Sequence, residues 1–189
     1  MSDLFEIRIH SRGGSGGKTA GQLIAETALS EKKWVQAFSE YGPERMGAPV
    51  QTYVKIHNKK ILSYSPIKHA EIVLVIDESL IDEKVVENIS STCVLIVNTH
   101  KNIKQKLKKL GFNGYIYCVD ATKIALQTIG KNLPNIALIG ALVKVSNGKI
   151  ITLNKLNERI KRVLSEKGDK IINTNSEAVK RSYNEVKKL

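Results

Sequence analysis

Cysteine and histidine are scarce in this sequence. Only two cysteines occur among 189 residues, Cys93 and Cys118, and both lie in apolar runs typical of buried strands. Because a four-thiolate iron–sulfur cluster needs four cysteine ligands, this chain cannot supply one by itself. The four histidines also lack the paired spacing of a metal site. We therefore expect buried, reduced thiols and no metal ion held by this chain alone.

Long uncharged apolar runs are missing as well. The two most apolar segments, residues 72–77 and 137–143, are far too short to cross a bilayer. The charged residues Glu6 and Arg8 come soon after the N-terminus, so no signal peptide is visible. We expect a cytoplasmic protein without membrane association, and a length of 189 residues suits one domain over 1–189.

Acidic residues are outnumbered by basic ones, 18 to 30, which gives a net charge of +12. Such a charge can indicate nucleic-acid binding. However, the densest lysine run, residues 101–109, has apolar residues at helical spacing, so its lysines belong to a solvated helix face. Aromatic residues make up only 5% of the chain and form no stacking pattern beside the lysines. Nucleic acid is therefore an unfavoured partner, and an acidic protein or an anionic cofactor explains the charge as well.

The chain is organised around a glycine-rich segment near its N-terminus, within residues 5–29. A strand-like apolar run enters a loop of four glycines and a serine, and a helix-like run leaves it. This arrangement builds anion sites in α/β proteins, because the first N–H groups of the helix lack partners within the helix. We predict that the loop faces a phosphate or carboxylate, mainly through its backbone and with added charge from its two ends. The predicted contact residues are Arg12, Gly13, Gly14, Ser15, Gly16, Gly17 and Lys18.

The glycine-rich loop does not fit either of the common phosphate fingerprints. A P-loop would need a glycine at Arg12, and a dinucleotide fingerprint would need glycine or alanine at Thr19. A plain tight turn with close strand–helix packing therefore stays open as the alternative. The chain also has no nucleophile elbow and no paired catalytic acids. Gly168-Asp169 is followed by Lys170, so the start of a thiamine diphosphate and magnesium motif is absent. A binding subunit fits these absences better than a free-standing enzyme.

A second unusual segment spans residues 40–49, where two prolines and two glycines exclude a regular helix or a central strand. It carries Tyr41, Glu44, Arg45 and Gly47. One interpretation is a closing loop that contacts a ligand or subunit, because loops often carry function. The other is a connector whose Glu44–Arg45 pair only fixes its shape.

The rest of the chain alternates apolar strand-like runs with helical runs, which predicts an α/β fold with a mostly parallel sheet flanked by helices. Residues 50–62 suggest a β-hairpin extension, and residues 135–145 suggest an apolar, buried helix. We expect further helices at residues 81–89, 103–110, 121–129 and 175–186. Asp77, Asn98 and Asp120 each follow or end a predicted strand, so they should gather with the glycine loop at the carboxyl edge of the sheet.

Three stretches together resemble a known family: residues 7–21, 41–50 and 134–143. The sequence is similar to the gamma subunits of pyruvate:ferredoxin oxidoreductases, also called pyruvate synthases, within the 2-oxoacid:ferredoxin oxidoreductases. The resemblance covers nearly the whole chain, and the segment around Glu44 and Arg45 is its most specific part. The loop departs from the family form, which has glycine at the Ser11 position and glutamine at the Ser15 position.

The resemblance implies a Rossmann-like domain that is not catalytic alone. The whole enzyme would convert a 2-oxoacid to an acyl-CoA and pass electrons to ferredoxin. Thiamine diphosphate and magnesium would lie between the alpha and beta subunits, and iron–sulfur clusters in the beta and delta subunits. The gamma subunit is implicated in coenzyme A binding, which would give the glycine loop an anionic ligand. Isolated, the chain is expected to form a homodimer. A free-standing nucleotide-binding protein and a purely structural subunit remain the alternatives.

Overall fold

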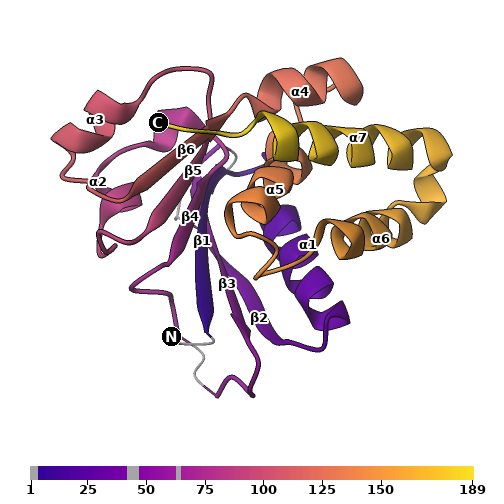
Figure 1. The fold of residues 1–189 in the computed structure, drawn as a ribbon, viewed down its shortest axis with the longest axis horizontal. Coiled ribbons are helices and arrows are strands. Elements are labelled where there is room, and N and C mark those ends of the chain that lie inside the picture. The colour runs from indigo at the N-terminus through magenta and orange to yellow at the C-terminus, as the bar shows by residue number, and fades with distance from the viewer. Residues whose placement is uncertain (1–3, 42–46, 63–64) are drawn as a thin grey trace.

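The computed structural model describes residues 4–41, 47–62 and 65–189. Seven strands form one mixed sheet in the order β2-β3-β1-β4-β5-β6-β7, and helices cover both faces (Figure 1). The strands are β1 (Phe5–Arg12), β2 (Trp34–Tyr41), β3 (Pro49–His57), β4 (Ile72–Val75), β5 (Val94–Asn98), β6 (Tyr115–Val119) and β7 (Lys187–Lys188). The helices are α1 (Gly17–Ser30), α2 (Glu83–Val86), α3 (Lys104–Lys109), α4 (Ala121–Thr128), α5 (Pro134–Val145), α6 (Leu153–Val163) and α7 (Asp169–Glu185).

The central strands β1, β4, β5 and β6 are parallel, which confirms the predicted α/β class. Strand β4 is buried along its whole length, as expected for a continuous apolar run. The chain leaves β1 through α1 toward β2 at one border of the sheet, and leaves β4 through α2 toward β5 on the other side. The connections therefore diverge between β1 and β4, and ligands of open α/β sheets bind beyond such a point.

The antiparallel part of the sheet differs from the prediction in its position. Strands β2 and β3 form the hairpin, with Trp34 opposite His57 and Tyr41 opposite Val50. The predicted turn at residues 58–60 does lie directly after β3, but residues 61–62 are not a strand. The reason is that β3 already has β1 on one side and β2 on the other, so no position beside it is free.

Helix α5 is the buried helix of the fold, as its apolar sequence predicts. It packs against the sheet in the larger apolar core, which also includes α1 and α7. The approach of α7 is very close at Gly140, where an added Cβ would lie 2.1 Å from the carbonyl oxygen of Val179. Helix α7 begins at Asp169, earlier than the predicted start at residue 175, directly after Gly168.

Two helices on the opposite face are short. Of the predicted helix over residues 81–89, only the short helix α2 forms, and a separate 3₁₀ turn at Glu78–Leu80 precedes it. Ile81 is extended, and Asp82 caps a new helix by accepting from the N–H groups of Lys84 and Val85. No helix within the described ranges is both long and apolar enough to span a membrane.

Candidate functional site

Arg12 ends β1 and holds three parts of the carboxyl edge together. Its Nε donates to Asp77 Oδ2 at 2.8 Å, its Nη2 to Ser79 Oγ at 2.8 Å and its Nη1 to the carbonyl oxygen of Gly47 at 3.1 Å. Burial opposes ionisation of Asp77, but hydrogen bonds from Ser79 and Arg12 outweigh it and lower the pKa of this carboxyl. The charge of Arg12 is therefore balanced by Asp77 within the chain.

The glycine loop is a compact turn that contacts the second unusual segment of the sequence. Ser15 donates its N–H to the carbonyl oxygen of Arg12 at 3.0 Å, and its Oγ accepts from the N–H of Arg12 at the same distance. The N–H of Gly13 donates to the carbonyl oxygen of Ala48 at 2.8 Å. Two stretches that the sequence singled out separately, the loop and the end of residues 40–49, thus lie side by side.

Two glycines of the loop are required by the packing. Gly16 has a φ of +84°, and an added Cβ would lie 2.3 Å from Asn135 Nδ2, which donates to the carbonyl oxygen of Gly16 at 3.2 Å. Gly17 packs on Ser11, whose Oγ would lie 2.1 Å from an added Cβ. These contacts bring α1 close to β1 and α5, as the alternative of a tight packing turn predicts.

The N-terminus of α1 has no side-chain cap. Gly16 occupies the capping position, and within the described chain no acceptor pairs with the N–H groups of Gly17, Lys18 or Thr19. Lys18 is exposed and forms no ion pair with any described residue. Unpaired N–H groups and the positive end of the helix dipole favour a negative charge at this place.

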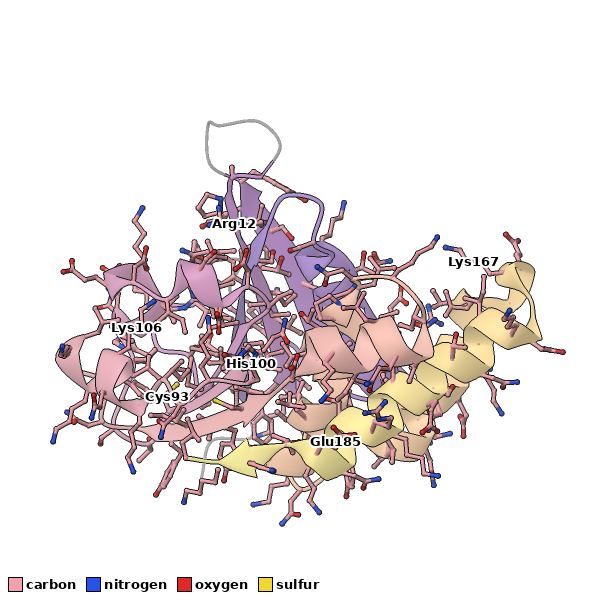
Figure 2. The ribbon with its side chains drawn as sticks, turned by 90° about the horizontal axis from the view of Figure 1, so that it is seen from above. Arg12, Cys93, His100, Lys106, Lys167 and Glu185 are labelled. Carbon is pink, nitrogen blue, oxygen red and sulfur yellow. The ribbon has the colours of Figure 1, made fainter. Side chains whose placement is uncertain are left out.

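One side of the glycine loop borders a cavity of about 730 Å³ beyond the strand ends, which we call the strand-end cavity. Figure 2 looks onto this edge of the sheet, where Arg12 and His100 are labelled. The predicted convergence is confirmed, because Ser15, Asp77, Asn98 and Asp120 all line it.

Asn98 has a structural role at this edge of the sheet. Its Nδ2 donates to the carbonyl oxygen of Ile76 at 2.8 Å and to Thr122 Oγ1 at 2.9 Å, and its Oδ1 accepts from the N–H of Thr122. The amide therefore connects the ends of β4 and β5 to the start of α4.

The other side of the loop borders a second cavity of about 880 Å³, the helix-side cavity. Gly14 and Gly16 line it from the loop, and α1, α6, α7 and the α4–α5 connection supply the rest of its wall. Its charged lining residues are Glu26, Lys131, Arg159, Lys167 and Lys170. Its apolar ones are Leu23, Ile129, Leu133, Ile136, Ile160, Val163, Leu164 and Ile171. The cavity combines an apolar floor with a cationic excess.

Of the remaining predicted site residues, the structure describes Tyr41 and Gly47, at the two ends of the β2–β3 connection. Tyr41 ends β2 and is 62% exposed. Gly47 has a φ of +86° and gives its carbonyl oxygen to Arg12. Glu44 and Arg45 lie outside the described residues, so their predicted role as a closing loop or ion pair stays a prediction.

Sequence reasoning missed several residues that shape this region. Ser79 and Asn135 position Arg12 and Gly16, and no local pattern marks a residue that acts through such distant contacts. Lys131 lies in the α4–α5 connection, whereas Lys167 and Lys170 lie just before and in the first turn of α7, so only the fold brings all three to one cavity. The signal for Asn135 was a polar residue directly after Pro134 in an otherwise apolar helix.

The cysteines are buried and unbonded, as predicted. Burial raises the pKa of Cys93 to about 12 and that of Cys118 to about 11, so both thiols stay protonated near neutral pH. In the described parts of the chain, no three histidine, cysteine, aspartate or glutamate side chains gather as a metal site would require.

Comparisons with known proteins identify the family. A family described as pyruvate ferredoxin/flavodoxin oxidoreductase matches residues 6–185. Pyruvate synthase subunit PorC of Thermotoga maritima is 44% identical over 184 residues, which are 97% of this chain and 95% of that protein. The common subunit gamma of the pyruvate/ketoisovalerate oxidoreductases of Pyrococcus furiosus is 37% identical, over 95% of this chain and 96% of that protein.

Solved structures agree with this similarity. The crystal structure of pyruvate oxidoreductase subunit PORC from Thermotoga maritima matches with a TM-score of 0.89 and 41% identity, over 99% of both chains. A 2-oxoglutarate:ferredoxin oxidoreductase from Magnetococcus marinus shares the fold at a TM-score of 0.81 and 17% identity, and the match covers 31% of that longer chain. This chain therefore belongs to the pyruvate ferredoxin/flavodoxin oxidoreductase family, as the motifs of its sequence predicted.

Proposed function

We propose that this chain is the gamma subunit of a multi-subunit pyruvate:ferredoxin oxidoreductase. The observation that carries the proposal is its 44% identity, over nearly its full length, with a pyruvate synthase subunit PorC. The complex would oxidatively decarboxylate pyruvate, form acetyl-CoA and reduce ferredoxin, in the cytoplasm. Alpha, beta and delta subunits would be its partners and would hold the thiamine diphosphate, magnesium and iron–sulfur clusters. Ferredoxin would be reached through the complex.

We further propose that the chain helps to bind coenzyme A at residues Arg12–Lys18. Coenzyme A carries phosphates and a long, less polar arm. The unpaired N–H groups of Gly17, Lys18 and Thr19 suit a phosphate, and Lys18 adds a free positive charge. Arg12, held by Asp77, would position the loop more than it would contact the phosphate.

The helix-side cavity supports an anionic ligand better than the strand-end cavity does. Lys131, Lys167 and Lys170 line the helix-side cavity without a carboxylate partner among the described residues, and only Arg159 is paired, with Glu26. The apolar floor of the same cavity would accept the less polar arm of the coenzyme.

A purely structural subunit is the second candidate. The specific observation in its favour is that φ values and close packing already account for Gly16 and Gly17. Under this reading the loop binds no ligand, and the subunit serves assembly alone.

The first experiment is to tag the chain in its native host and purify it anaerobically under mild conditions. Iron-rich brown material that contains thiamine diphosphate and larger subunits is the expected result. A colourless, lone protein would contradict the proposal and would direct the work to nucleotide binding by a free-standing domain.

Hydrogen exchange of the purified complex, with and without coenzyme A, tests the ligand. We expect the amides of Gly14–Thr19 to exchange more slowly when coenzyme A is present, because they would donate to its phosphates. The matched control region is the N-terminus of α4, which Asp120 already caps. Equal exchange in both states at residues 14–19 would favour the purely structural subunit.

A further inference from the structure

The two borders of the sheet are built very differently. One border is β7, which has only two residues, Lys187 and Lys188. The other is β2, which pairs with β3 along all eight of its residues and has no strand on its outer side within the described chain (Figure 1). None of the eight residues of β2 is buried. In an antiparallel strand every second residue directs its N–H and C=O away from its neighbour, so β2 presents a row of backbone groups outward.

Strand β2 also lacks the lysine, proline and glycine residues that often protect an edge strand. Lysine and arginine account for 30 of the 189 residues, yet Trp34–Tyr41 contains neither, and it contains no proline or glycine. Its one charged residue, Glu40, accepts from Tyr53 Oη at 3.0 Å. The aromatic residues at its ends, Trp34 and Tyr41, are 50% and 62% exposed. A long, regular edge of this kind is a template for another strand.

The sequence of β2 is complementary to itself. In antiparallel pairing about a two-fold axis perpendicular to the sheet, opposite residues lie on the same face, so odd-numbered residues meet odd-numbered ones. With Phe38 opposite Phe38 of a second copy, Val35 meets Tyr41, Ala37 meets Ser39, and the amide of Gln36 meets the carboxylate of Glu40. This register places no two like charges opposite each other.

We propose that β2 pairs antiparallel with β2 of a second copy of this chain, which makes one continuous sheet through a homodimer. The outward N–H and C=O groups of both strands then bond to each other, and Tyr41 gains Val35 of the other copy as its cross-strand neighbour. The dimer forms at a border of the sheet, away from the glycine loop. It does not depend on coenzyme A binding or on the enzyme activity of the assembled complex.

The first test measures the mass of the purified full-length chain by sedimentation equilibrium over a range of concentrations. We expect a monomer–dimer equilibrium whose dissociation constant rises at least about tenfold in Ala37→Lys, because the two new lysines lie near each other across the axis. Asn113→Lys adds the same charge in an exposed loop and is expected to leave the constant unchanged. A wild-type chain that stays monomeric, or a dimer that persists in Ala37→Lys, would overturn the proposal.

The second test determines the register of the β2–β2 pairing by disulfide cross-linking. It does not depend on a variant that weakens the pairing. Val35→Cys and Tyr41→Cys chains are mixed and oxidised, and the buried Cys93 and Cys118 should not react. We expect a disulfide-linked dimer in the mixture and much less in either variant alone, since only the mixture places the new thiols opposite each other. Protection of residues 34–41 from hydrogen exchange only after other subunits are added would show that the edge accepts a different strand, and would refute pairing with a second copy.

Discussion

The two cavities beside the glycine loop share a wall but differ in the charged side chains that line them. The strand-end cavity is lined by Asp77, Glu78 and Asp120 against the single lysine Lys123, whereas the helix-side cavity has four cationic residues against one carboxylate. Open α/β sheets usually bind ligands beyond their strand ends. In this chain the strand-end cavity is lined by the carboxylates. The helix-side cavity, on the other side of the glycine loop, is the one suited to an anion. The usual position of ligands in this fold therefore does not identify the binding cavity unless the charges of the lining residues are also considered.

The largest expected effect on stability comes from substituting a glycine of the loop that both cavities border. Gly16→Ala places a Cβ against Asn135 and forces a positive φ on alanine, so we expect the free energy of unfolding to fall by about 2–3 kcal/mol. Gly14→Ala is the matched control, because Gly14 has a φ of +90° but open space around its Cβ position. It should cost only the backbone strain, about 1–2 kcal/mol. Urea unfolding of the full chain measures both, and equal losses would show that the Asn135 contact contributes nothing.

Charge reversal tests which cavity the proposed binding of coenzyme A would use. In the assembled complex, Lys167→Glu combined with Lys170→Glu should raise the KM for coenzyme A about tenfold or more, because it places carboxylates beside the proposed phosphate path. Lys123→Glu makes the same kind of change in the strand-end cavity and should alter the KM much less. The opposite ranking, measured by steady-state kinetics at saturating pyruvate, would move the coenzyme to the strand-end cavity.

Each cavity also has one carboxylate paired with an arginine, and these pairs give the smallest expected effects. Burial opposes the ionisation of Glu26, but hydrogen bonds from Gln22 and Arg159 outweigh it and lower its pKa, as Ser79 and Arg12 do for Asp77. At neutral pH we expect Glu26→Gln and Asp77→Asn each to cost about 1 kcal/mol or less, since both pairs are partly exposed.

The lowered pKa values also predict how the stability cost of these two substitutions changes with pH. A carboxyl with a lowered pKa in the folded state stabilises the protein above its unfolded pKa, near 4, and loses that contribution as the pH falls through the folded value. The difference between wild type and each variant should therefore be present at pH 7 and shrink below about pH 4. A difference that grows on acidification, measured by urea titrations at both pH values, would contradict the assigned pairs.

Local patterns predicted the elements, and tertiary contacts decided their details. The apolar runs at residues 72–76 and 135–145 correctly predicted a buried strand and a buried helix, because burial on all sides requires such sequences. The turn after His57 was correctly placed, but its second strand was not, since occupancy of both sides of β3 is a property of the sheet. The meeting of Asp77, Asn98 and Asp120 followed from parallel topology alone.

The charge of the helix-side cavity could not be predicted in the same way. Lys131, Lys167 and Lys170 are unremarkable among 30 basic residues, and only the fold brings the α4–α5 connection and the start of α7 to one cavity. Lys167 is labelled in Figure 2 on the layer formed by α6 and α7, away from Arg12. The partnership of Arg12 with Asp77 likewise depends on residues 65 positions apart in the sequence.

The close contact between α5 and α7 has a consequence for synthesis on the ribosome. Helix α5 is apolar nearly all round, and one of its sides packs closely at Gly140 on α7, which is translated after α1 to α6. Until α7 has emerged, the nascent chain exposes an apolar helix that the sheet and α1 cannot cover alone. The nascent protein should therefore need chaperone protection late in translation, and a stop codon within α7 should yield an aggregating product.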